Sequence, residues 1–260
     1  MTAQSGSTDL SITVEDGVAV LEMRRPPANY FDELLIGRIV DGARNLDDDP
    51  ACRVIVLASQ GRHFCAGADF SGGDFAEDRV GAAGRLYRRA VQLFEGRTPI
   101  VAAVQGSAVG GGLGLACAAD FRVADRDSRF VANFAALGFH QGFGLSVTLP
   151  EVVGRRAAAD MLLTARRVGG EEALRLGLAD RLAEPGQVRA AAVELAQQIA
   201  ANAPLAVRSI RATLRADLAP RVRQALDHEL AEQEVLWATR DSGEGIAASL
   251  ERRPPVFRGR

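Results

Sequence analysis

The stretches His63-Phe64-Cys65-Ala66-Gly67-Ala68-Asp69 and Gly106-Ser107-Ala108-Val109-Gly110-Gly111-Gly112-Leu113-Gly114 decide the fold of this chain. Each follows a short apolar run, at residues 53–58 and 100–104, that is typical of a buried parallel strand. Two strand ends that each lead into a glycine turn can direct two backbone N–H groups at one point. Such paired donors stabilise an oxygen on which negative charge develops. For either stretch alone, an ordinary turn is the competing interpretation.

Together the two stretches resemble the crotonase (enoyl-CoA hydratase/isomerase) superfamily. Three further segments resemble it in family order: Arg-Pro-Pro-Ala-Asn at 25–29, Leu-Gly-Leu-Ala-Asp at 176–180, and the tail at 252–260. The resemblance therefore runs almost from end to end. It implies an α/β fold, a crotonase-like spiral of repeated ββα units with a C-terminal helical trimerisation region.

Composition sets limits on the class of protein. The chain has 260 residues, a formal net charge of −2 and no apolar run of membrane-spanning length, so we expect a soluble globular protein that binds neither nucleic acid nor membrane. All 31 basic residues are arginine, which excludes lysine Schiff-base chemistry. Three unpaired cysteines suit a reducing cytoplasm and indicate neither disulfides nor a metal site.

Hydrophobic periodicity predicts the order of the elements. A hairpin is expected at 10–14 and 18–23 about Asp16-Gly17, and a helix at 32–46 with Asp32 as its cap. Besides the two strands above, we predict short strands at 121–124, 129–131 and 178–182. Further helices are predicted at 81–97, 110–119, 188–201, 205–215, 221–240 and 244–251.

Three regions are expected along the chain. Residues 1–8 are polar and predicted to be disordered, and residues 71–80 read as a mobile polar loop. Residues 9–200 would form the spiral core with the acyl-CoA site, and residues 201–260 a helical oligomerisation region. The resemblance implies a homo-oligomer, a trimer or a dimer of trimers.

The resemblance assigns the oxyanion donors to the backbone N–H groups of Ala68 and Gly111. Gly111 also stands where a helix is expected to begin, and the positive end of the helix dipole favours a developing negative charge. Gly110 and Asp69 belong to the same motifs and are expected to contact the substrate. Asp69 reads as a structural hydrogen-bond acceptor rather than a base.

The acid–base groups are where the sequence departs from the family. Hydratases that resemble this chain carry two glutamates, and Gly114 and Phe134 stand in their places. An aspartate that other members place near Gly142 is absent as well. Hydration of a conjugated double bond needs a base for the water and an acid for the α-carbon. Two-glutamate hydration is therefore not expected, and Phe134 becomes a substrate contact.

Other side chains could transfer protons. His140 is the leading candidate base, because imidazole titrates near neutrality, although a lone histidine is commonly structural. Gln141 could orient a water molecule or bind a carbonyl oxygen. Tyr87 could donate a proton or a hydrogen bond, and core packing with a satisfied hydroxyl is the alternative.

For the coenzyme A half of the ligand, the resemblance implies contacts from five positions. Backbone groups of Ala28 and Ala66 would meet the adenine, and Arg25 would meet phosphates through charge-assisted hydrogen bonds. Arg252 and Phe257 of the tail would close over the nucleotide. We expect no metal and no cofactor other than the coenzyme A that is part of the substrate.

These observations favour an acyl-CoA-processing enzyme that stabilises a thioester enolate between two amides. Isomerisation, decarboxylation and hydrolysis all fit, because none of them needs two glutamates. The alternative is a catalytically silent acyl-CoA-binding subunit. A dinucleotide-binding oxidoreductase is excluded, because Leu115 occupies the place of the last glycine of the G-x-G-x-x-G motif.

Overall fold

The computed structural model describes residues 9–69 and 77–260. The predicted disorder of residues 1–8 and most of the predicted loop at 71–80 lie outside the described residues. The strands are β1 (Leu10–Glu15), β2 (Val18–Met23), β3 (Val54–Ser59), β4 (Ile100–Ala103), β5 (Ser107–Val109), β6 (Phe121–Asp125), β7 (Arg129–Val131), β8 (Arg167–Gly169) and β9 (Arg181–Ala183). The helices are α1 (Glu33–Asp48), α3 (Arg79–Ala90), α4 (Gln92–Glu95), α5 (Gly111–Ala118), α6 (Leu145–Thr164), α7 (Gly170–Leu176), α8 (Val188–Ala200), α9 (Pro204–Leu214), α10 (Leu218–Trp237) and α11 (Arg240–Glu251), with a 3₁₀ turn, η1 (Ala135–Leu137).

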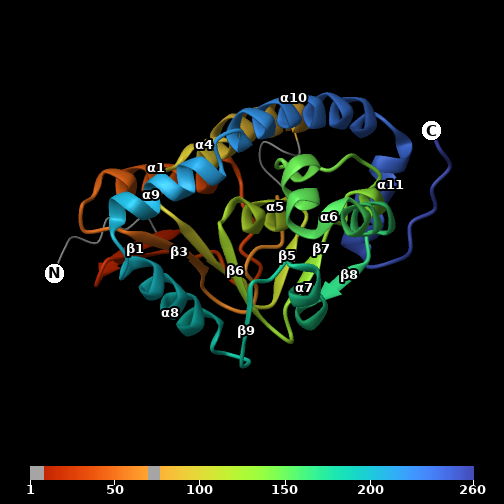
Figure 1. Ribbon diagram of the computed structural model, residues 1–260. Helices are drawn as coiled ribbons and strands as arrows, with labels where there is room; N and C mark the ends of the chain where they lie inside the picture. Colours follow the sequence, from red (N-terminus) through yellow and green to blue (C-terminus); the bar gives the residue numbers. More distant parts are fainter. Residues whose placement is uncertain (1–8, 70–76) are drawn as a thin grey trace.

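Two sheets form the framework of the molecule (Figure 1). The larger sheet has the order β1-β2-β3-β4-β6-β9, in which β1 is antiparallel to β2 and the remaining neighbours are parallel. The smaller sheet has the order β5-β7-β8, with β5 and β7 parallel. From β4 to β7 the strands alternate between the two sheets along the chain. The prediction of an α/β fold with parallel strands is confirmed.

Both faces of the larger sheet are buried, which explains its uninterrupted apolar strands. In β3, Val54 and Val56 face α8, while Ile55 and Leu57 face the main core. In Figure 1 helix α8 lies below β1 and β3, and α1 and the C-terminal helices α9 and α10 lie above them. The alternation of faces follows from the two-residue period of a strand.

Local signals at the N-terminal end of the chain are confirmed. Asp16 and Gly17 have φ values of 50° and 83°, which are the positive values that a type I′ hairpin turn requires. The Asp32 side chain accepts a hydrogen bond from Leu35 N at 2.8 Å and caps α1 as predicted.

Several element bounds differ from the predictions. The single helix predicted at 81–97 is two helices, α3 and α4, joined at Val91. The strand predicted at 178–182 begins only at Arg181. Helix α6 has no predicted counterpart, because Pro150 and the non-helical Gly154 (φ 77°) interrupt its pattern and bend it. No helix of the described residues is long and apolar enough to cross a membrane.

The C-terminal helices return over the first part of the chain. Helix α10 packs against α3 and α6, and α11 packs against η1. In Figure 1 α10 runs along the top of the molecule and leads into α11 at the side. The predicted boundary between residues 200 and 201 falls at the end of α8. Trimer formation through this region stays a prediction.

Candidate active site

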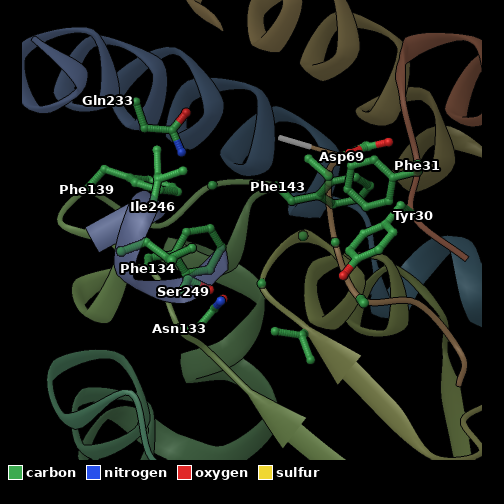
Figure 2. Close-up of a pocket in the computed structure, with 18 of the residues that line it drawn as sticks. Tyr30, Phe31, Asp69, Asn133, Phe134, Phe139, Phe143, Gln233, Ile246 and Ser249 are labelled. Atoms are coloured by element: carbon green, nitrogen blue, oxygen red, sulfur yellow. The ribbon is translucent and has the colours of Figure 1, made fainter. Parts of the chain in front are cut away.

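A cavity of about 520 Å³ lies between the two glycine stretches and the C-terminal helices (Figure 2). One wall carries residues 66–69 and 109–111, and the opposite wall carries Gln233, Trp237 and Ile246. Figure 2 shows Tyr30, Phe31, Asp69 and Phe143 on one side and Phe139, Gln233 and Ile246 on the other. The wall is largely hydrocarbon, as in most small-molecule sites, with a few polar groups set into it.

Backbone hydrogen bonds hold the two glycine stretches side by side. Cys65 N donates to Ser107 O at 3.0 Å, and Val109 N donates to Cys65 O at 3.0 Å. A Cβ on Gly67, which has φ +97°, would lie 2.9 Å from Val109 O and 3.7 Å from Gly111 N. Only glycine permits this close approach and this backbone conformation. The prediction that the stretches meet at one place is therefore confirmed.

Two unused N–H groups belong to the cavity wall. Gly67 O accepts a hydrogen bond from Phe31 N, and Phe31 O accepts one from Asp69 N. This β-bridge bonds the two neighbours of Ala68 and leaves the N–H of Ala68 itself unused. Gly111 is the first residue of α5 and has no partner within its own helix. Among the described residues, neither Ala68 N nor Gly111 N donates a hydrogen bond. Both residues line the cavity.

The places expected for carboxylates are filled by other groups. A Cβ on Gly114 would lie 2.6 Å from the Cβ of Phe143, a fully buried side chain. A Cβ on Gly142 would fall on the hydroxyl of Tyr87. Phe134 lines the cavity and packs edge-on against Phe139, with ring centroids 5.9 Å apart. Neither glycine leaves room for a longer side chain.

Tyr87 lies in the cavity wall with its hydroxyl satisfied. The hydroxyl donates to Gln233 Oε1 at 2.9 Å, and Gln233 Nε2 donates to His140 O at 3.0 Å. Burial, reinforced by the nearby charge of Glu229, raises the pKa of Tyr87 well above its usual value. Tyr87 is therefore a neutral hydrogen-bonding group, which favours the packing alternative considered for it above.

His140 and Gln141 are not among the side chains that line the cavity. His140 Nδ1 lies 2.9 Å from Gln141 O, and its ring packs against His228 with centroids 5.7 Å apart. Gln141 Nε2 donates to Ser146 Oγ at 3.0 Å. The structure thus brings Ala68, Gly111, Tyr87, Asp69 and Phe134 together and leaves His140 and Gln141 outside.

Glu229 on α10 is a functional candidate that sequence reasoning missed. Its side chain is fully buried and accepts from Gly144 N and Ser146 N, both at 2.8 Å. Burial raises its pKa to about 6, against the lowering effect of these hydrogen bonds. Val222, Leu226, Glu229 and Gln233 are buried and have helical spacing on α10. Two polar residues on this otherwise apolar face were the sequence signal that could have identified Glu229.

Of the residues predicted to contact coenzyme A, some lie at the cavity wall and others lie outside it. Ala66 N donates to Ala28 O at 2.9 Å, so these residues are adjacent, and Ala66 lines the cavity. Arg25 forms salt bridges with Asp9 and Asp32, both at 2.9 Å, which already occupy its guanidinium. In the tail, Arg252 ends α11 in a left-handed conformation and Phe257 is 41 % exposed. Neither tail residue lines the cavity.

Comparison with known proteins gives a consistent result. The family model for enoyl-CoA hydratase/isomerase matches residues 13–260. A crotonyl-CoA hydratase of Syntrophomonas wolfei is 32% identical over 252 residues, covering 94% of this chain and 95% of the relative. A carnitinyl-CoA dehydratase of Proteus mirabilis is 32% identical over 264 residues, covering 98% of this chain and 100% of the relative.

Solved structures agree with the sequence relatives. The crystal structure of an enoyl-CoA hydratase/isomerase from Pseudoalteromonas atlantica has a TM-score of 0.85 at 28% identity, covering 96% of this chain and 100% of that chain. An enoyl-CoA hydratase from Mycobacterium avium subsp. paratuberculosis has a TM-score of 0.85 at 27% identity, covering 96% and 98%. The expected crotonase-like fold is therefore confirmed.

Proposed function

We propose a function for this chain, which belongs to the enoyl-CoA hydratase/isomerase family and is an enzyme of that kind. The proposal is that it binds an acyl-CoA thioester with the carbonyl oxygen between Ala68 N–H and Gly111 N–H. The observation that carries it is the pair of unused donors on one cavity wall. When a proton or carboxylate leaves the α-carbon, the negative charge that develops on this oxygen would be stabilised there.

The magnitude of the effect is large enough to matter. One preorganised donor of this kind is worth about 3 kcal/mol in the transition state. At Gly111 the N-terminal end of α5 adds a favourable dipole. Both donors are fixed by backbone hydrogen bonds of neighbouring residues, so they need no reorganisation when charge develops.

The reaction we propose is isomerisation, decarboxylation or hydrolysis rather than two-glutamate hydration. The names of the two relatives describe hydration and dehydration, and those activities are theirs. In this chain, Phe143 fills the space beside Gly114 and Phe134 contributes a hydrocarbon ring. Neither position offers a carboxylate for the acid–base steps of two-glutamate hydration.

Proton transfer is assigned to a different residue from the one that the sequence favoured. Among the described residues that line the cavity, Asp69 is the one that carries a carboxylate, and it directly follows Ala68. His140 lies outside the cavity wall and is not proposed again. Asp69, for which the sequence favoured a structural role, is therefore the base that we propose for an isomerase reaction.

Turnover of a panel of acyl-, enoyl- and malonyl-type CoA esters, followed by mass spectrometry, tests this function. We expect the wild type to convert at least one ester and Gly111→Pro, which deletes the donor, to lose about 100-fold or more in rate. Ala68→Gly is the control, because it changes a donor residue, keeps its N–H and adds no atom to the cavity wall. Asp69→Asn should lose turnover while still binding the ester.

Full activity of a folded Gly111→Pro protein would refute the oxyanion assignment. Binding of esters by the wild type without conversion of any of them would instead support the silent acyl-CoA-binding subunit.

A further inference from the structure

Asn133 is a polar residue in the cavity wall to which the proposed reaction gives no role. It lies two residues after the end of β7 and precedes Phe134, the residue in the place of a hydratase glutamate. Its side chain is half-buried and lines the cavity. Figure 2 shows the carboxamide end of Asn133 turned toward the cavity.

The position of this carboxamide is defined by Gly110. A Cβ on Gly110 would lie 2.9 Å from Asn133 Oδ1, so the carboxamide packs against the α-carbon of that glycine. Gly110 has φ 55° and ψ −119° and immediately precedes the donor Gly111. Since the α-carbon of one residue is only about 2.4 Å from the nitrogen of the next, Asn133 lies beside the proposed thioester oxygen.

The hydrogen-bonding capacity of this carboxamide is unused. Within residues 9–69 and 77–260, the Asn133 side chain makes no hydrogen bond, and only its backbone carbonyl accepts one, from Leu137 N. A carboxamide offers two N–H donors and an acceptor oxygen. Its neighbours on this wall, Val109, Phe134 and Leu137, are apolar. Because the carboxamide is only half-buried, solvent can reach it, and a ligand that displaces the solvent must supply a polar partner or leave the amide unpaired.

Gln233 provides the contrast. It is also an amide in the cavity wall, but its two ends are bonded to Tyr87 and His140, so it maintains the wall. Asn133 has no such structural partners. A neutral amide cannot take part in proton transfer, so its use is recognition rather than acid–base chemistry.

We propose that Asn133 determines specificity by hydrogen-bonding an oxygen carried by the acyl group close to the thioester. The substrate class is then an acyl-CoA with a hydroxyl or keto oxygen near the thioester carbon. This inference rests on the proposed function, because it requires the thioester oxygen at Gly111. A site that hydrogen-bonds such an oxygen discriminates against analogues that lack it, since the amide of Asn133 then faces the apolar part of the ligand without a partner.

The preference for an oxygenated acyl group can be measured by calorimetric titration with three esters: butyryl-CoA, 3-hydroxybutyryl-CoA and acetoacetyl-CoA. We expect the wild type to bind at least one oxygenated ester about tenfold more tightly than butyryl-CoA. In Asn133→Leu, which has a similar volume, this advantage should fall below about twofold while butyryl-CoA affinity changes little. Asn202→Leu is the control, because Asn202 is exposed and bonds only to its own helix.

Asn133→Asp is the second variant and is close in shape to the native residue. A carboxylate accepts but does not donate, so it should retain 3-hydroxybutyryl-CoA and lose acetoacetyl-CoA. Equal weakening of all three esters in Asn133→Leu, or unchanged selectivity, overturns this inference alone. If Asn133→Leu loses turnover but keeps the selectivity among the esters, the amide binds a water molecule rather than an oxygen of the acyl group. That result would also overturn the inference. If the wild type binds none of the three esters, the proposed function fails together with this inference.

Discussion

Gly114 and Phe143 are complementary residues, and their complementarity explains why this site lacks the carboxylate that the resemblance leads one to expect. Phe143 is 1% exposed and has φ 61°, an unusual conformation for an aromatic residue. Its ring packs against Phe31 with centroids 5.5 Å apart. The ring therefore occupies the space beside α5 that any side chain at position 114 would need. Restoring a glutamate by a single substitution is sterically excluded.

We predict that Gly114→Ala lowers the free energy of unfolding by about 1–3 kcal/mol, because an added carbon at this position overpacks the core. Phe143→Ala should also destabilise, through the cavity that it leaves. The double variant should lose less than the sum of the two, because removing the ring abolishes the contacts of the methyl group with Cγ and Cδ1 of Phe143, both at 2.9 Å, and leaves only the contact with Cβ. Urea unfolding of the four proteins measures this coupling.

Gly243→Ala is the matched control, because it lies in α11 and a Cβ there would meet nothing within 4 Å. It should leave stability unchanged or raise it, as expected for an exposed helical glycine. Strictly additive effects of Gly114→Ala and Phe143→Ala would contradict the steric account.

Helix α10 fixes the loop that forms one wall of the cavity. Glu229 bonds the backbone of Gly144 and Ser146, and Gln233 bonds the carbonyl of His140. The helix thus determines where Phe139 and Phe143 lie without itself supplying a reacting group. Glu229 acts on the site as a positioning residue.

The ionisation of Glu229 should make stability depend on pH. Its pKa is raised to about 6 in the folded protein from the usual 4.5, so the folded state holds the proton more tightly than the unfolded state. The associated stability is present below pH 4.5 and is lost as the pH rises through 6, a change of about 2 kcal/mol. Glutamine does not titrate, so the free energy of unfolding of Glu229→Gln should rise relative to that of the wild type by this amount as the pH increases. Urea unfolding at pH 4.5 and pH 7 measures it, and a difference that is independent of pH would contradict the prediction.

Elements with strong local signals were predictable and elements without them were not. The hairpin at Asp16-Gly17, the Asp32 cap and strand β7 follow from turn chemistry, capping and alternation. Helix α6 escaped prediction because Pro150 and Gly154 break its period, and β5 because its three residues lie within the glycine stretch 106–114, which reads as a turn. The start of β9 at Arg181 is set by its pairing with β6, a contact that the local sequence does not encode.

Across the complete chain, the cavity joins segments that are far apart in sequence. Residues 66–69 and 109–111 supply the donors, and Gln233, Trp237 and Ile246 close the opposite side (Figure 2). The donor side could be predicted, because family motifs name its residues. The helical side could not, because it depends on how α10 and α11 return over the core. The placement of His140 outside the cavity wall depends on the same packing.

The donor pair is the claim on which the remaining assignments depend, and the absorption spectrum of bound cinnamoyl-CoA tests it most directly. Hydrogen bonds to the thioester oxygen draw electron density along the conjugated system, so binding to the wild type should move the absorption band to longer wavelength. Ala68→Pro and Gly111→Pro should each reduce this shift at saturating ligand, and Ala68→Gly, which keeps the N–H, should preserve it. An undiminished shift in both folded proline variants would contradict the account.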